Sequence, residues 1–246
     1  MLEEVADGVH RLEHAYVNVY LVVEGTDVLL VDTGLPATWN EIGSALRRLG
    51  RRPTDIAGVV LTHAHFDHIG CAARLQERLG VPFWLHTADE HLAAHPYSYA
   101  HERPRSAYPL RHPRAVPILT AVARAGALRV PGVSGTEPLE PAATLPVPGS
   151  PRVVFSPGHT FGHCGLHLRD RDVVLTGDAL VTLDPYTAGE GPQVVAGAAT
   201  ADSALALASL DALAATGATT VLPGHGRPWR DGIQTAVEQA RAVGAH

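Results

Sequence analysis

The stretch Thr62-His63-Ala64-His65-Phe66-Asp67-His68 brings three histidines and an aspartate together in one short segment. Side chains alternate between the two faces of an extended segment, so His63 and His65 point to the same side. Asp67 and His68 follow where the chain is expected to turn. Imidazole and carboxylate groups together suit zinc, iron or manganese. The spacing therefore predicts that His63 and His65 share one metal ion, while Asp67 and His68 face a second one close by.

Three further segments follow one pattern, in which an apolar run reaches a glycine and a potential metal ligand comes next. Glycine lets the backbone turn sharply at the end of a strand, which brings the next side chain into a cleft. Loops at strand ends over a rigid sheet are a common place for such a site. The ligands presented in this way are His159 after residues 153–158, Asp178 after residues 173–177, and His225 after residues 221–224.

The apolar periodicity around these segments predicts alternating strands and helices, which is typical of a layered α/β sandwich with helices outside two sheets. A length of 246 residues suits one domain over 1–246. We expect strands at Val9–Leu12, Asn18–Val23, Val28–Val31, Gly58–Leu61, Pro82–His86, Val153–Ser156, Gly165–Leu168, Val173–Thr176 and Thr219–Leu222. We expect helices at Pro36–Arg48, Gly70–Leu79, Val116–Ala127, Ala201–Ala215 and Ile233–Val243, and a Gly/Pro-rich loop at 184–192.

The stretch from Thr87 to Gly149 is rich in Pro, Arg, His and Tyr, which predicts an inserted cap rather than part of a regular sheet. We expect this cap to line the cleft and to set substrate choice. Candidate substrate contacts are Tyr97, Tyr99 and Tyr108. The cap arginines could meet an anionic substrate, although a solvated face is the simpler interpretation; they are Arg103, Arg105, Arg111 and Arg114.

Composition excludes several classes of protein. All 19 basic residues are arginine, so Schiff-base and Walker-A lysine chemistry are excluded. A net charge of −6 argues against nucleic-acid binding. The two cysteines form no CxxC, so neither a disulfide framework nor a cysteine zinc site is indicated. No apolar stretch approaches the ~20 residues of a membrane span, and no signal peptide is visible. We expect a cytoplasmic protein with a small-molecule substrate, no nucleic-acid or membrane partner, and a possible homodimeric assembly.

With these motifs in order along the chain, the sequence resembles the metallo-β-lactamase-fold hydrolase superfamily. The motifs run from Val31-Asp32-Thr33-Gly34 to Gly224-His225-Gly226. The resemblance implies an αββα sandwich with a two-metal cleft along one edge and an inserted cap. It also implies the ligand sets: one metal held by His63, His65 and His159, the other by Asp67, His68 and His225, with Asp178 bridging both.

The resemblance narrows the subfamily mainly by exclusion. Classical zinc β-lactamases of this fold carry cysteine at the position of Asp178, so penicillin hydrolysis is disfavoured. Glyoxalase II-type thioesterases place basic residues after the bridging aspartate, and residues 180–185 contain none. Quorum-quenching lactonases have tyrosine three positions after it, where this chain has Val181; Tyr186 is a possible substitute. Diiron flavoprotein members replace the second cluster histidine with glutamate, whereas this chain retains His65.

The implied activity is hydrolysis of a small ester, thioester or lactone by a metal-bridging hydroxide. Asp67 would accept a hydrogen bond from the hydroxide and handle a proton. Two divalent ions are expected, most simply zinc, with iron and manganese as alternatives. One rival is a mononuclear non-haem iron enzyme similar to persulfide dioxygenases, using His63, His159 and Asp178. A second rival is a non-catalytic binding module on the same fold.

Two further residues have structural interpretations. His163 follows His159 by four positions, and we expect it to form a supporting hydrogen bond rather than to bind metal. Asp32 lies in an Asp-Thr-Gly turn and is expected to be a carboxylate that orients a ligand histidine.

Overall fold

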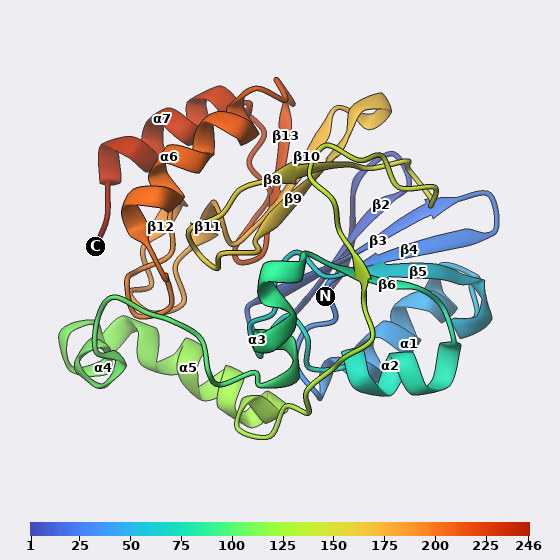
Figure 1. Ribbon diagram of the computed structural model, residues 1–246, viewed down its shortest axis with the longest axis horizontal. Helices are drawn as coiled ribbons and strands as arrows, with labels where there is room; N and C mark the ends of the chain where they lie inside the picture. Colours follow the sequence, from blue (N-terminus) through green and yellow to red (C-terminus); the bar gives the residue numbers. More distant parts are fainter.

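Short β-branched strands separated by tight turns build the larger of two main sheets in the computed structural model, which describes residues 1–246 apart from the side chain of Ala107 (Figure 1). The first four strands pair antiparallel, and β4 to β7 pair parallel. The strands, in their order across the sheet, are β1 (Leu2–Ala6), β2 (Val9–His14), β3 (Val17–Glu24), β4 (Asp27–Val31), β5 (Ile56–Val60), β6 (Phe83–Leu85) and β7 (Glu137–Pro138).

The second sheet carries the glycine-ended segments that the sequence singled out. β13 pairs parallel with β10, while β9 pairs antiparallel with both β10 and β8. The strands, in order, are β13 (Thr220–Pro223), β10 (Val173–Gly177), β9 (Cys164–Leu168) and β8 (Arg152–Phe155). β10 and β13 run in the same direction, so their carboxyl ends lie side by side at one edge.

Four helices cover the outer faces of the two sheets. Asp202 caps the third of them, because its side chain accepts a hydrogen bond from the Leu205 N–H at 2.8 Å. The first ends before Gly50, whose φ of 67° only glycine adopts without strain. The helices are α1 (Thr38–Arg48), α2 (Ala72–Leu79), α6 (Ser203–Ala214) and α7 (Ile233–Val243).

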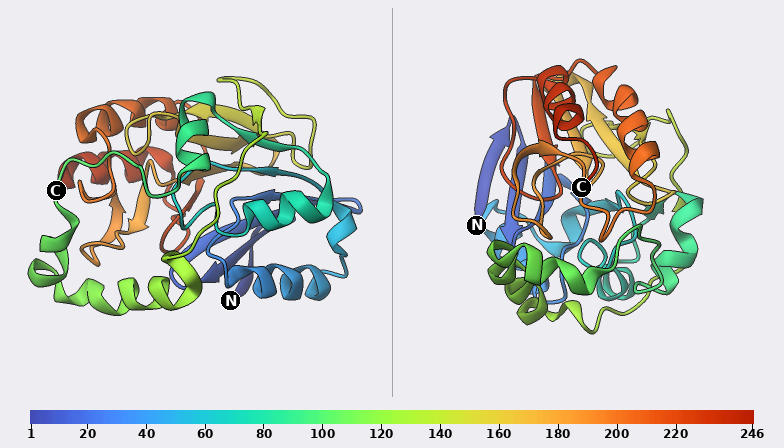
Figure 2. Two further views of the ribbon diagram at one scale, coloured as in Figure 1. Left: turned by 60° about the horizontal axis from the view of Figure 1, so that its bottom comes forward. Right: turned by 90° about the vertical axis from the view of Figure 1, so that its left-hand side faces the viewer.

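Three separate layers of buried side chains show that the molecule has four layers of secondary structure. Leu46 of α1 and Leu75 of α2 pack on one face of the larger sheet. Leu29 and Leu166 belong to the cluster between the two sheets. Helices α6 and α7 pack on the outer face of the smaller sheet, where Leu210 is fully buried. The predicted αββα sandwich is confirmed, and Figure 2 shows the helices on either side of the paired sheets.

The cap consists of short helical pieces that extend beneath the β11 and β12 strands in Figure 1. Its last part differs from the expectation, because β7 pairs with β6 and Leu139 and Val147 belong to the cluster between the sheets. The segment outside the sandwich is therefore shorter than 87–149. Its pieces are α3 (Glu90–Ala94), α4 (Tyr108–Arg111), α5 (Val116–Val122), a π-type turn at Ala123–Ala127 and 3-10 turns at Thr87–Asp89, Arg105–Ala107 and Pro113–Ala115.

The Gly/Pro-rich stretch expected to be a loop over 184–192 is a loop only over 184–189, because residues 190–192 belong to a strand. Strands β11 (Val181–Leu183) and β12 (Glu190–Gln193) pair antiparallel on either side of this shorter loop. The remaining 3-10 turns are Pro53–Asp55 and Arg169–Arg171. Within the described part of the chain, none of the helices combines the length and apolar character needed to cross a bilayer.

Candidate metal centre

Four loops at one edge of the sandwich bring the predicted ligands together. The loop after β5 carries His63, His65, Asp67 and His68, and the remaining ligands lie on three other loops. His159 lies between β8 and β9, Asp178 directly follows β10, and His225 follows β13 by one glycine. All seven side chains predicted as ligands lie at this one place.

The donor atoms fall into three overlapping groups in which all atoms lie within 4.8 Å of one another. Such spacing is compatible with metal coordination by each group. His63 and His68 each belong to two groups, so the groups are contiguous. The groups are His63, His65 and His159; His63, His68 and Asp178; and Asp67, His68 and His225.

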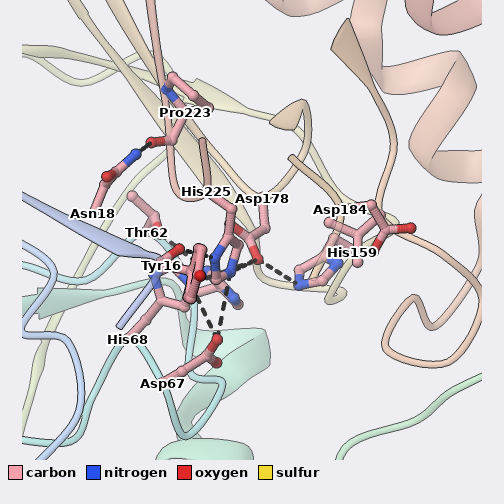
Figure 3. A network of polar contacts seen from close by, with 12 residues as sticks. Tyr16, Asn18, Thr62, Asp67, His68, His159, Asp178, Asp184, Pro223 and His225 are labelled. Carbon is pink, nitrogen blue, oxygen red and sulfur yellow. Dashed lines mark hydrogen bonds and ion pairs between the residues drawn. The ribbon is translucent and has the colours of Figure 1, made fainter. Parts of the chain in front are cut away.

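The Asp178 carboxylate lies at the centre of the cluster (Figure 3). Its Oδ2 atom is 3.2 Å from His225 Nε2, 3.5 Å from His68 Nε2 and 3.5 Å from His159 Nε2. Asp67 Oδ2 lies 3.4 Å from His225 Nε2. One carboxylate therefore contacts histidines from both predicted ligand sets.

The hydrogen-bonding state of these atoms fits a metal site. Among the residues that the structure describes, the Nε2 atoms of all five predicted ligand histidines are buried without a hydrogen-bond partner, as is Asp178 Oδ1. Buried polar atoms are normally paired, because leaving one unpaired costs about 1–3 kcal/mol. Five such nitrogens converging on two carboxylates are what a cation site requires. The residues present therefore fit a divalent metal ion.

Asp32 orients His68, as the sequence-based interpretation expected. The Nδ1–H of His68 donates to Asp32 Oδ2 at 2.9 Å, which leaves Nε2 facing the cluster. Asp32 Oδ1 also accepts the backbone N–H of Thr62 at 2.8 Å. One buried carboxylate thus fixes both the imidazole and the start of the histidine loop.

Three other ligand histidines, His225, His63 and His159, are held in the same way, with Nδ1 engaged and Nε2 facing the cluster. His225 donates from Nδ1 to the backbone carbonyl of Tyr16 at 2.8 Å. That carbonyl lies in the tight turn between β2 and β3. His63 Nδ1 lies 3.0 Å from Thr62 Oγ1, and His159 Nδ1 lies 3.4 Å from Thr200 Oγ1.

A second buried carboxylate, Asp89, links two of the ligand loops and was not identified from the sequence. Its Oδ2 accepts the N–H of Ala64 at 3.0 Å and the hydroxyl of Thr160 at 2.7 Å. Its Oδ1 accepts the N–H of Gly162 at 2.8 Å. Burial raises the pKa of Asp89, and these three donors oppose that shift. No local pattern marks this residue, because its partners come from two distant loops.

The backbone at Gly224 passes so close to the ligand cluster that no side chain fits there. A Cβ at this position would overlap the Asp178 carboxylate and the His68 ring. The glycine that precedes His225 is therefore required by space, in addition to the turn that the sequence pattern predicted.

Burial and the neighbouring charges shift the pKa values of the clustered groups in different directions. Burial opposes protonation of His225, but Asp178 and Asp67 outweigh it and raise its pKa to about 10. Burial, followed by the neighbouring histidines, lowers the pKa of His63 well below its ordinary value. Burial alone would raise the pKa of Asp178, but His225 and His68 hold it well below the usual range. In the metal-free protein, protons on histidines such as His225 offset the negative charges of Asp67 and Asp178.

The cleft beside the cluster is narrow and partly aromatic. It is lined by His65, Phe66, Asp67, Tyr99, His159, Asp178, Pro185, Tyr186, Val195, Ala199 and His225. Of the three tyrosines expected to contact substrate, only Tyr99 lines this cleft. The hydroxyl of Tyr97 instead donates to the Ala127 carbonyl at 2.8 Å. Tyr108 packs against Ala196 and Ala198 and is not among the residues that line the cleft.

Comparison with known proteins agrees with this geometry. The sequence matches the metallo-beta-lactamase superfamily over residues 13–225. A Bacillus subtilis protein named "Probable metallo-hydrolase YflN" is 27% identical over 237 residues, which cover 92% of this chain and 86% of that protein. A hydroxyacylglutathione hydrolase of Cereibacter sphaeroides is 26% identical over 143 residues, covering 58% of this chain and 41% of that protein.

Solved structures give the same result. The metallo-beta-lactamase family protein TTHA1429 from Thermus thermophilus superposes with a TM-score of 0.71 and 28% identity, covering 98% of this chain and 80% of that one. TTHA1623, solved in a di-iron-bound form, gives a TM-score of 0.61 at 26% identity, covering 92% and 95% of the two chains. The chain therefore belongs to the metallo-β-lactamase superfamily, and its metal-binding His/Asp cluster places it broadly among metal-dependent hydrolases.

Proposed function

We propose that this chain is a hydrolase that holds two divalent cations, most simply zinc, and cleaves a small ester, thioester or lactone. The observation that carries the proposal is the position of Asp178. Its Oδ2 lies 3.2 Å from His225 Nε2 and 3.5 Å from His159 Nε2, so one carboxylate faces histidines of both ligand sets. A carboxylate has two oxygens and can bridge two cations, which an imidazole nitrogen cannot do.

The proposed ligand sets match two of the three groups of donor atoms, and the third group joins Asp178 to His63 and His68, one histidine of each set. His63, His65 and His159 would hold one cation, Asp67, His68 and His225 the other, and Asp178 would contact both. When bound, such a pair of cations supplies an acidified water and polarises a carbonyl oxygen. Iron remains compatible with the same donors, since imidazole and carboxylate suit it as well.

The chain's own residues supply the remaining functions. The side chain of Asp67 is 13% exposed, the most accessible carboxylate of the cluster, and it lines the cleft. It is therefore placed to accept and hold a proton near the reacting carbonyl. Phe66 and Tyr99 line the cleft beside it and restrict water and large substrates. The relative named hydroxyacylglutathione hydrolase supports hydrolysis of an acyl compound.

Metal content and turnover on the same sample test the proposal. Protein purified without added metal is submitted to elemental analysis and then assayed against ester, thioester and lactone panels and against a persulfide, with oxygen uptake recorded in parallel. We expect about two metal ions per chain and hydrolysis without oxygen uptake. One iron per chain with oxygen uptake on a persulfide would instead support the dioxygenase alternative. Two bound metals without turnover on any panel would support a binding module.

A further inference from the structure

A cap arginine contacts the aromatic wall of the proposed active site. The guanidinium carbon of Arg105 lies 3.9 Å from the centroid of the Tyr99 ring. Tyr99 is only 7% exposed and lines the cleft. The same ring lies against the imidazole of His65, with 4.4 Å between the ring centroids. Tyr99 therefore connects the Arg105 side chain directly to a proposed metal ligand.

The charge of Arg105 has no counterion within the described part of the chain. No ion pair there includes Arg105, and its buried Nε atom has no hydrogen-bond acceptor. A guanidinium presents five N–H donors in a planar fork that matches a carboxylate. The Arg105 guanidinium stacks on a tyrosine that lines the cleft and has no anion beside it, so N–H donors remain available for a ligand. By contrast, Arg114, on the same cap, is exposed.

The phenol of Tyr99 lies beside this guanidinium, and the phenol of Tyr186 lies beside that of Tyr99. The hydroxyl oxygens of Tyr99 and Tyr186 are 3.4 Å apart, so one of them can donate to the other while the second proton stays available. The backbone of Tyr186 is fixed by a hydrogen bond, because its N–H donates to Asp184 Oδ1 at 2.9 Å. A phenol keeps its proton at neutral pH, so both hydroxyls can act as hydrogen-bond donors.

We propose that Arg105, together with Tyr99 and Tyr186, forms a subsite for a carboxylate group of the substrate. The inference rests on the proposed function and makes it more specific: the substrate is an ester, thioester or lactone that also carries a carboxylate a few atoms from the carbonyl that is cleaved. A planar carboxylate suits the guanidinium fork, and the narrow cleft favours it over a bulkier phosphate.

A matched pair of thioesters tests this subsite through turnover. The pentanoyl and glutaryl thioesters of N-acetylcysteamine differ only in the terminal carboxylate and release the same thiol. We expect the native protein to favour the glutaryl compound. Arg105→Gln should lower kcat/KM for the glutaryl thioester roughly tenfold or more relative to kcat/KM for the pentanoyl thioester, the size of a lost charged hydrogen bond. Arg105→Lys keeps the charge but loses the planar fork of donors, so its preference for the glutaryl thioester should lie between those of the native protein and Arg105→Gln.

Calorimetric titration supplies a readout that does not depend on turnover. Metal-loaded protein is titrated with glutarate, pentanoate and inorganic phosphate. We expect glutarate to bind more tightly than pentanoate, and Arg105→Gln to remove that difference. Arg114→Gln is the matched control for loss of one cap charge and should retain it.

The outcomes separate the two proposals. A glutarate preference that needs Arg105, in a protein that hydrolyses none of the thioesters, would retain the subsite and reject the hydrolase. Hydrolysis with equal activity on both thioesters, or glutarate binding no tighter than pentanoate binding, would reject the subsite and retain the hydrolase. Tighter binding of phosphate than of glutarate through Arg105 would also overturn the carboxylate assignment.

Discussion

His163 holds the backbone of Asp178 in place: its Nε2 atom accepts a hydrogen bond from the Asp178 N–H at 3.0 Å. It also accepts from the Ala179 N–H at 3.2 Å, and its Nδ1 pairs with Ser156 Oγ at 2.9 Å. Because Nε2 accepts two hydrogen bonds, the imidazole is neutral and Nδ1 carries the proton. Burial first, then His159, lowers its pKa to about 3, in agreement with this state. His163 therefore positions the central carboxylate, as the sequence-based interpretation expected.

Removing this imidazole should loosen Asp178. We expect His163→Ala to lose about 1–3 kcal/mol of unfolding free energy in the metal-free protein, because two buried N–H groups lose their acceptor. Metal affinity should also fall. His163→Gln can return one acceptor and should recover part of both losses. Chemical denaturation and competition with a chelator measure the two quantities. Unchanged values in His163→Ala would contradict the positioning role.

Substitution of Asp178 should affect both proposed metal sites. Asp178→Ala should weaken binding of both ions, the one with Asp67, His68 and His225 most. Asp178→Asn keeps the size but removes the charge and one good acceptor, so we expect it to be nearly as damaging. Elemental analysis and turnover per folded molecule check this, with the exposed Asp170→Asn as a surface control. Folded Asp178→Asn with two ions and near-native turnover would refute the bridging role.

Asp89 should be needed for the relative placement of two ligand loops. In Asp89→Asn, one side-chain oxygen becomes an NH2 group that faces an N–H or O–H donor. We expect a loss of about 1–3 kcal/mol in unfolding free energy together with weaker metal binding. Thr160→Val removes one of the three hydrogen bonds and should have a smaller effect. The exposed neighbour Glu90→Gln serves as a control. Native metal affinity in Asp89→Asn would show that the loops hold their positions without it.

The metal-free protein should become less stable as pH rises from about 7 to 10. The pKa of His225 in the folded protein, about 10, lies above its ordinary value of 6.5. Protonation of His225 therefore contributes its full stabilisation of the fold at pH values below 6.5. That contribution is lost as pH rises through the folded pKa, with a slope of up to about 1.4 kcal/mol per pH unit. Denaturation of metal-free protein across this range measures it. His225→Gln should lack this component of the slope, and an identical slope in both proteins would contradict the prediction.

Substitution of two cap tyrosines should distinguish an effect on stability from an effect on substrate binding. The Tyr97 hydroxyl donates to the Ala127 carbonyl and accepts the Val130 N–H at 2.7 Å, so Tyr97→Phe should reduce stability without changing KM. The Tyr99 hydroxyl faces Tyr186 at the cleft, so Tyr99→Phe should change KM or substrate ranking. Thermal denaturation and steady-state kinetics test the pair. A KM change confined to Tyr97→Phe would reverse the assignment.

The fold class and the set of clustered ligands could be predicted from local sequence patterns. Each ligand is encoded locally, by a histidine cluster after one strand or by a strand, a glycine and a polar residue in succession. Because the strands of a sheet deliver their ends to a shared edge, these patterns were enough to predict that His63, Asp178 and His225 meet. The helix and strand periodicity similarly predicted the four layers.

The groups that support the cluster could be identified only in the folded chain. Asp89 and the Tyr16 carbonyl carry no motif, because their roles exist only once loops far apart in sequence have closed on one another. The cap shows the same limit: Tyr97 and Tyr99 are indistinguishable by composition, yet one bonds the cap backbone and the other lines the cleft. Local patterns specify backbone turns and ligand chemistry, whereas long-range packing specifies which side chains meet.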